Sequence, residues 1–428
     1  MSLTRTIAPA IADLPTDLSI VPEVKYASSG ARMHVYKNHI QPVVRIEFVF
    51  KAGKWYQPKA GVASLTAKML KEGTAFHTAK EIADTVDYYG ASLEITHGFD
   101  RATVTLYCLS KFLPFLLPLT FEIIQQPSFP EKEFALMKQR VIQTLTVDKQ
   151  KNGYLATETF TGALYGKYHP YTTFISEEEI SALRLTDLQD FHSQAYTFPS
   201  SEIFITGDIT DAAVEGILTL ITSQKASSLQ EPVISPLKGH AEDRLIIEKT
   251  SNDLQASIRA GKPIIHPSHP DYPALYLLNH VLGGYFGSRL MKNIREDKGF
   301  TYGIYSSLSH KEHSSLFSIG TDTKGDKIEE TLAEILKEIA LLRNELVPEN
   351  ELATTKKHLA GKFLSDHATL FDKMDKYKSN TILNLGTDFS SQLLEKIADL
   401  EASQLLEAAN KYFQEEDLLQ VVTGGATK

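Results

Sequence analysis

Two residues in the second half of the chain, Arg295 and Tyr302, have types suited to holding and polarising a carbonyl group. A guanidinium donates two parallel hydrogen bonds to a carbonyl or carboxylate, and a tyrosine hydroxyl can stabilise a developing oxyanion. Taken alone, Arg295 also has a simpler interpretation. An arginine late in a helix can meet the helix dipole or a nearby carboxylate such as Glu296 or Asp297.

The elements that must position these residues follow from residues 281–305, VLGGYFGSRLMKNIREDKGFTYGIY. Glycines open the stretch and allow tight or left-handed backbone. Apolar residues then recur at helical spacing, at Leu290, Met291 and Ile294. This spacing predicts a helix over residues 288–295 that ends at Gly299, followed by a strand over 301–305.

The whole stretch resembles the C-terminal-domain signature of the M16 (pitrilysin) metallopeptidases, which runs roughly G-G-x-x-x-S-R-L-x-x-x-x-R-x-x-x-G-L-x-Y. Phe300 in place of Leu is the only departure. The resemblance implies that Arg295 and Tyr302 lie across a cavity from zinc and hold the substrate peptide. It implies further substrate contacts at Gly283, Gly284 and Ser288. A phosphate loop at the two glycines is excluded, since no Lys-Ser/Thr and no G-x-G-x-x-G follows. Tyr285 and Tyr305 are predicted to be packing residues.

The same family carries an inverted zinc motif, H-x-x-E-H, on the first helix of its N-terminal half. Its two histidines bind zinc, and the Glu between them activates a zinc-bound water. Residues 60–74, AGVASLTAKMLKEGT, resemble the family's A-G-L-A-H-F-L-E-H-M-x-F-K-G-T closely enough to fix the register. The three motif positions hold Ser64, Ala67 and Lys68. The region of the third ligand, residues 139–147, has no carboxylate, and the equivalent position is Thr144 or Leu145.

This replacement decides the chemistry expected of the first helix. Alanine cannot move a proton, and a lysine ammonium at a metal position repels a dication. We therefore expect this chain to bind no metal or other cofactor and to be inactive by itself. Two other histidine pairs, His266 with His269 and His310 with His313, are predicted to lie in solvated loops, since neither has two further ligands. His77 lies in a turn without a ligand partner at helical spacing.

Bulk properties exclude several classes of protein. The 428 residues are too many for one core and predict two or more domains. A net charge of -9, with basic residues spread along the chain, argues against a nucleic-acid partner. No apolar run approaches the roughly 18 residues of a membrane span. The start lacks the pattern of a signal peptide, so we expect a cytoplasmic protein, or a periplasmic one if a signal was removed. The single cysteine, Cys108, is predicted to be a buried structural thiol.

The second half of the chain repeats the first. Three anchors recur in the same order: 130–138 in 348–356, Leu188 and Tyr196 in Leu405 and Phe413, and 205–207 in 422–424. Their offsets are 218, 217 and 217 residues, which indicates an internal duplication. A region rich in serine and proline between the halves has little periodicity. We therefore predict an N-terminal domain at 1–222, a linker at 223–243 and a C-terminal domain at 244–428.

Each half is expected to contain a strand, helices, a strand pair, long helices and a last strand. This order predicts an α+β fold, in which helices pack against a mostly antiparallel sheet. In the first half the expected strands are 43–50, 92–95, 102–109 and 202–206, and the expected helices are 61–70, 78–89, 111–124, 130–147 and 187–196. The resemblance implies the M16 or LuxS-like metallohydrolase fold, with two homologous domains enclosing a cavity.

Two functions of different classes remain open. In the first, the chain is the zinc-less subunit of a heterodimeric M16 peptidase. Arg295 and Tyr302 then reach an unstructured peptide while the partner supplies zinc, water and a general base. In the second, the chain is a non-catalytic peptide-binding or scaffold protein, as a homodimer or within a complex, similar to the alpha subunit of processing peptidase or the core proteins of a respiratory complex. Such a protein holds peptides by β-augmentation. A self-sufficient zinc peptidase would require stoichiometric zinc.

Overall fold

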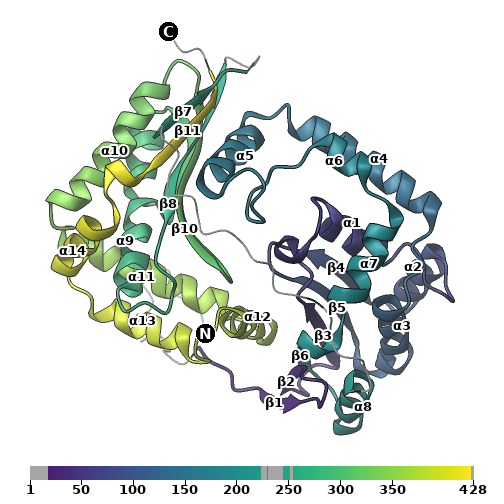
Figure 1. Ribbon diagram of the computed structural model, residues 1–428. Coiled ribbons are helices and arrows are strands. Elements are labelled where there is room, and N and C mark those ends of the chain that lie inside the picture. The colour runs from purple at the N-terminus through teal and green to yellow at the C-terminus, as the bar shows by residue number, and fades with distance from the viewer. Residues whose placement is uncertain (1–17, 223–228, 230–243, 251–253, 426–428) are drawn as a thin grey trace, which may run out of the picture.

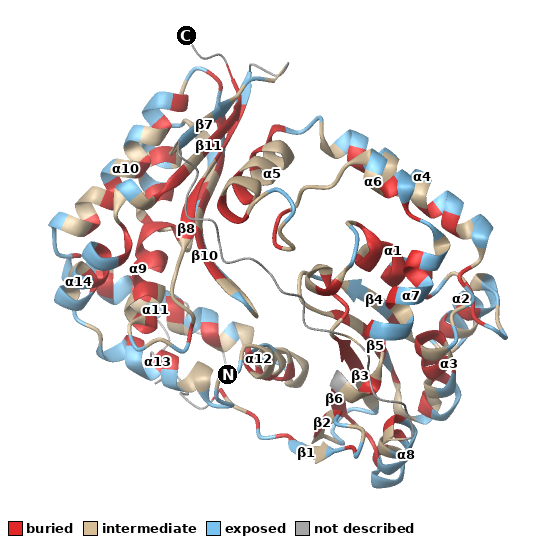
Figure 2. Cartoon of the chain, in the orientation of Figure 1, coloured by how far each residue is buried: buried red, intermediate tan, exposed pale blue. Residues whose placement is uncertain are grey.

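The computed structural model describes residues 18–222, 229, 244–250 and 254–425. The predicted linker, apart from Leu229, lies outside the described residues. The chain forms two α+β halves, each with one sheet covered by helices (Figure 1). Buried residues follow the strands and the helix faces turned toward them (Figure 2). The described part of the chain has no helix with the length and apolar character needed to cross a membrane.

The N-terminal half is built on a six-stranded sheet in the order β1-β2-β6-β3-β5-β4, in which only β2 and β6 run parallel. The strands are β1 Glu23–Tyr26, β2 Arg32–Lys37, β3 Val43–Phe50, β4 Ser92–His97, β5 Ala102–Leu109 and β6 Glu202–Gly207. The helices are α1 Val62–Met69, α2 Ala79–Tyr88, α3 Leu113–Gln125, α4 Glu131–Asp148, α5 Asn152–Tyr165, α6 Glu177–Ala182, α7 Leu185–Ala195 and α8 Asp211–Thr222. Short 3-10 turns occur at η1 Lys54–Tyr56, η2 Ser110–Phe112 and η3 Phe198–Ser200.

The C-terminal half is built on a five-stranded sheet in the order β7-β11-β8-β10-β9. The strands are β7 Leu245–Glu248, β8 Gln255–Pro263, β9 Thr301–Lys311, β10 Ser314–Lys324 and β11 Leu419–Gly424. The helices are α9 Tyr272–Gly283, the π-helix η4 Met291–Asp297, α10 Ile328–Asn344, α11 Glu349–Asp366, α12 Leu370–Ile382, α13 Phe389–Asp399 and α14 Ala402–Tyr412. A 3-10 turn, η5 Glu415–Asp417, precedes the last strand.

The predicted internal duplication is confirmed by the order of the strands. Without β1, the first sheet reads β2-β6-β3-β5-β4, and the second reads β7-β11-β8-β10-β9 in the same chain order. Each sheet has one parallel pair at the corresponding place, β2 with β6 and β7 with β11. The matched strand ends also agree, because Gly207 (φ 114°) and Gly424 (φ 87°) both adopt left-handed backbone.

Lys138 and Lys356, which correspond in the repeated segments, make equivalent hydrogen bonds. Lys138 lies in α4 and Lys356 in α11, the corresponding long helix. Each ammonium donates to two backbone carbonyls at the C-terminal end of a shorter helix, α6 or α13, which comes second after it in the chain. Helix carbonyls at that end lack intrahelical partners. The acceptors, at 2.6–3.1 Å, are Ser181 O, Leu183 O, Ala398 O and Leu400 O. A long-range contact is therefore repeated along with the sequence.

Each half also lends one helix to the sheet of the other half. The helix α5 covers β8 and β11 of the C-terminal sheet, with Phe160 and Leu164 in a shared apolar cluster (Figure 1). In the reverse direction, α12 covers β6, and Met374 packs near Phe204. These helices occupy corresponding places in the repeat, so the exchange is reciprocal. The two halves are thereby joined over both sheets.

Candidate functional site

The three degenerate motif positions lie on α1 in the register that the sequence predicts. Ser64 and Lys68 are four residues apart and so lie on one side of the helix. Ser64 is half-buried and lines a cavity of about 650 Å³. Lys68 is exposed, whereas Ala67 is 1 % exposed and packs into the core. None of the three carries a group that binds zinc or activates water.

The surroundings of these positions are cationic. Burial lowers the pKa of His97 to about 4, and repulsion from Lys68 and Lys54 adds to the effect. Burial also lowers the pKa of Lys54. Nearby on α4, Leu145 is buried and the Thr144 hydroxyl donates to the carbonyl of Arg140 at 2.9 Å. The residues present do not fit a zinc ion, since they provide positive charge and no carboxylate ligand.

Elsewhere among the described residues, no three or more His, Cys, Asp or Glu side chains cluster in a way that could hold a metal ion. His266 and His269 lie in the loop after β8, as predicted. The prediction of a solvated loop is wrong for His310, whose ring nitrogens contact the hydroxyls of Tyr272 and Ser315, each at 2.9 Å. Burial lowers the pKa of His310 to about 4.

Arg295 lies in η4 and is only partly exposed. Its guanidinium carbon lies 4.6 Å from the centre of the Phe286 ring. Among the described residues, no carboxylate forms an ion pair with the Arg295 guanidinium. The simpler interpretation, an ion pair with Glu296 or Asp297, is therefore not seen. The guanidinium is therefore left with donors for another group.

Tyr302 is 93 % exposed and lies at an irregularity near the start of β9. The ladder with β10 passes from Thr321↔Ile304 to Thr323↔Thr301, so Tyr302 falls inside a β-bulge. β9 is also the edge strand of its sheet. Bulges at sheet edges redirect side chains and occur often beside active sites. Here the bulge carries Tyr302, whose side chain makes few contacts with the rest of the protein.

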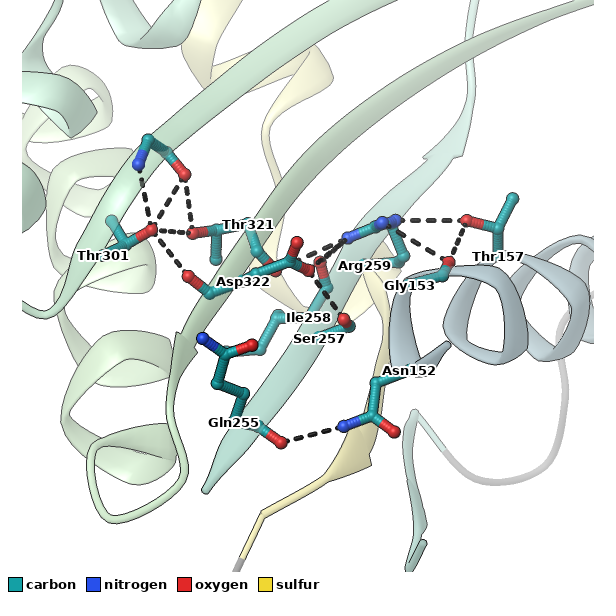
Figure 3. Close-up of polar contacts among 11 residues, drawn as sticks. Asn152, Gly153, Thr157, Gln255, Ser257, Ile258, Arg259, Thr301, Thr321 and Asp322 are labelled. Atoms are coloured by element: carbon teal, nitrogen blue, oxygen red, sulfur yellow. Dashed lines mark hydrogen bonds and ion pairs between the residues drawn. The ribbon is translucent and has the colours of Figure 1, made fainter. Parts of the chain in front are cut away.

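A network of hydroxyl groups holds this bulge in place (Figure 3). The Thr301 hydroxyl lies 2.9 Å from Gly303 O and 2.7 Å from Asp322 O. Thr321 Oγ1 is 2.9 Å from Thr301 Oγ1 and 2.9 Å from Gly303 O. The backbone on either side of Tyr302 is thus fixed, although its side chain is exposed. A fixed backbone with an exposed hydroxyl suits a residue that meets a ligand.

The glycine-rich turn has a packing role. A Cβ on Gly283 would lie 2.6 Å from Ser306 N, and one on Gly284 would lie 2.6 Å from His280 Nδ1. Ser288 is 1 % exposed, so its hydroxyl lies in the core. This geometry gives the two glycines a structural reason, and substrate contact at Gly283, Gly284 and Ser288 stays a prediction.

The two tyrosines expected to be packing residues differ. Tyr285 does pack: its ring stacks on His280 at 4.8 Å between centroids, and its hydroxyl lies 3.3 Å from Thr355 Oγ1. Tyr305 does not, because it is 51 % exposed on β9. The odd-numbered residues of β9 face away from the helices, and Tyr305 follows that alternation.

Sequence reasoning missed a polar contact between the halves, at the β9–β10 turn. The Tyr171 hydroxyl donates to Asp100 Oδ1 at 2.6 Å and accepts from His313 N at 3.1 Å. The His313 ring stacks on Trp55 with 4.0 Å between ring centres. The residues involved are far apart in the sequence, and the single tryptophan is the only feature that could have drawn attention to it.

Comparisons with known proteins agree with this geometry. Residues 32–169 match the family model described as insulinase (peptidase family M16), and residues 182–359 match the one described as peptidase M16 inactive domain. A Bacillus subtilis relative named uncharacterized zinc protease YmxG is 23% identical over 85% of this chain and 88% of its own. A Helicobacter pylori relative named non-peptidase homolog YmxG is 22% identical over 92% of this chain and 91% of its own.

Solved structures show the same architecture. A peptidase M16 inactive domain from Pseudomonas fluorescens superposes with a TM-score of 0.84 at 27% identity, over 95% of this chain and 99% of that chain. A protease from Helicobacter pylori superposes with a TM-score of 0.82 over 94% of this chain and 99% of its own, and its 20% identity indicates a shared fold.

Proposed function

Because this chain belongs to the M16 peptidase family as an inactive homologue, we propose that it is the zinc-less subunit of a two-subunit peptidase. The observation that carries the proposal is the contrast between the two candidate sites. The zinc positions on α1 hold Ser64, Ala67 and Lys68, while Arg295 and Tyr302 keep their functional groups available. A partner chain with the zinc motif would complete the site.

The chemistry divides between the two subunits. Zinc in the partner would polarise the scissile carbonyl and supply an activated water. In this chain, the Arg295 guanidinium donates hydrogen bonds to a carbonyl of the bound peptide and holds it in place. The Tyr302 hydroxyl donates to the oxyanion that forms when water attacks the carbonyl. The bulge on β9 fixes the backbone from which Tyr302 reaches the peptide.

A specific observation also favours the second candidate, a peptide-binding or scaffold subunit. Both sheets have an edge strand at the corresponding end, β4 in the N-terminal half and β9 in the C-terminal half. An extended peptide can add to such an edge through backbone hydrogen bonds. This binding requires neither Arg295 nor Tyr302, and in that case no turnover depends on them.

Two substitutions distinguish these candidates. The account predicts that Arg295→Ala and Tyr302→Phe, each in the complex with a zinc-bearing M16 subunit, lower kcat by about 10²-fold while assembly is unchanged. Tyr305→Phe is the matched control, since it removes an exposed hydroxyl from the same strand. Size-exclusion chromatography measures assembly, and a fluorogenic peptide measures turnover. Unchanged turnover in both variants would favour the scaffold.

A further inference from the structure

A cavity lies beside α1, and residues of the N-terminal half form its whole lining. It has a volume of about 650 Å³, which lies in the range of small-ligand sites. Its wall comes from the segment after β3, the end of β4, α4, α6 and the loop before α6 (Figure 1). Apolar side chains form one part of the wall: Val141, Phe174, Ile175, Ile180 and Leu183.

Basic side chains form another part of the wall: Lys54, Lys59, His97, Lys167 and His169. Among the described lining residues, Glu179 is the only one with a carboxylate. Its Oε2 accepts from the Ser176 backbone N–H at 2.8 Å as part of a helix cap. Lys59 is held by Asp187 at 2.7 Å. The cavity therefore has an excess of positive charge.

Two nitrogen groups in this wall have no hydrogen-bond or ion-pair partner among the described residues. Lys54 forms no ion pair with a described carboxylate, and its Nζ lies 5.2 Å from the centre of the Phe99 ring. Burial of the ammonium lowers its pKa, because the charged form loses contact with water. The Nδ1 atom of His97 is buried, and no hydrogen-bond partner for it occurs in the described structure. An anion would offset both deficits.

We propose that this cavity binds the free C-terminal carboxylate of a peptide whose last side chain is apolar. The Lys54 ammonium and the Nδ1–H form of His97 hold the carboxylate, and the apolar wall holds the side chain. The inference rests on the proposed function, since it specifies which end of the peptide this subunit takes.

The test compares two forms of one unstructured oligopeptide ending in leucine, one with a free C-terminal carboxylate and one with a C-terminal amide. Fluorescence anisotropy of the unmodified protein measures both affinities. The free acid is expected to bind at least about tenfold more tightly, because a charged hydrogen bond to the ammonium is lost in the amide. Equal affinities would overturn the proposal, and so would the absence of binding by either peptide.

Variants locate the site. Lys54→Met keeps the length of the side chain and removes its charge, and it is expected to abolish the preference for the free acid. Lys132→Met is the matched control, since Lys132 is exposed on α4 outside the cavity and should leave the preference intact. If Lys54→Met fails to fold, His97→Phe provides a second variant with the same expected loss. Retention of the preference in both would overturn the assignment.

Two further results separate this inference from the proposed function. Displacement of the peptide acid by inorganic phosphate, together with equal binding of peptides ending in leucine and in serine, would indicate a site for any anion and overturn it. Hydrolysis of amidated and free-acid peptides at equal rates in the mixed complex would also overturn it while leaving the split peptidase intact. The failure of this inference can therefore be distinguished from the failure of the proposed function.

Discussion

Arg101 in the β4–β5 turn and Glu312 in the β9–β10 turn form a two-pronged ion pair between the halves, with Nε–Oε1 and Nη2–Oε2 distances of 2.5 and 2.7 Å. Only 15% of the Arg101 side chain and 11% of the Glu312 side chain are exposed. The Glu312 backbone N–H also donates to Asp100 Oδ2 at 3.1 Å. The tip of the C-terminal hairpin is thereby fixed to the N-terminal sheet.

Breaking this pair is expected to destabilise the protein. Glu312→Gln leaves the Arg101 charge largely buried without its carboxylate, which should lower the free energy of unfolding by about 3 kcal/mol. Chemical denaturation at neutral pH measures the change. Asp84→Asn is the control, because the Lys80–Asp84 pair is exposed and should contribute less than about 0.5 kcal/mol. Equal effects of the two substitutions would contradict the structural role of the pair.

The protein should become less stable as the pH is lowered, because it contains a buried histidine that is neutral in the folded state. His280 is 4 % exposed, its Nε2 lies 2.9 Å from His358 Nδ1, and burial lowers its pKa to about 4. The unfolded chain, with a histidine pKa near 6.5, then binds the proton first. Stability is therefore lost as the pH falls from about 6.5 to about 4. His280→Gln should remove up to about 3 kcal/mol of that loss, because each unit of pKa shift corresponds to about 1.4 kcal/mol. Parallel stability curves for the variant and the parent would contradict this assignment.

Zinc should have no specific effect on this chain. The motif positions supply a hydroxyl, a methyl group and an ammonium, and His97 stands among positive charges. Elemental analysis of protein purified with zinc and then dialysed is expected to show substoichiometric metal, and chelator should leave Tm unchanged. One zinc per chain, together with a lower Tm in chelator, would mean that the degenerate site is wrongly placed.

The glycine-rich turn should be sensitive to a single methyl group. In Gly283→Ala the new Cβ meets the backbone of Ser306 at 2.6 Å, so we expect a loss of about 2 kcal/mol in the free energy of unfolding. Gly361→Ala is the matched control. It lies in α11 with no atom within 4 Å of the new Cβ, and it should stabilise the helix by up to about 1 kcal/mol. A tolerated Gly283→Ala would leave a direct role in peptide binding as the reason for the glycine.

Local signals in the sequence predicted many individual elements. Thr78 and Glu81 form the predicted capping box, with Glu81 N 3.3 Å from Thr78 Oγ1 and Thr78 N 2.8 Å from Glu81 Oε2. The predicted strand pair at β4 and β5 is present, and Cys108 is 1 % exposed. Hydrophobic periodicity and helix capping depend on residues only a few positions apart, so both can be recognised in the sequence.

Contacts between distant segments could not be predicted in this way. The reciprocal exchange of α5 and α12 depends on which sheet each helix reaches after folding. His34 illustrates the point, since its ring contacts the Tyr377 hydroxyl at 2.8 Å and Glu202 Oε2 at 2.9 Å. Neither partner is a sequence neighbour. For the same reason, the burial of Ser288 and the cationic cavity beside α1 required the three-dimensional structure.

The most direct test of the split-site account is peptide hydrolysis by the purified chain, by a zinc-bearing M16 subunit from the same source, and by the two together. The account predicts hydrolysis only in the mixture, inhibited by chelator and lowered by Arg295→Ala. Hydrolysis by this chain alone, or no hydrolysis in the mixture despite a stable complex, would contradict it.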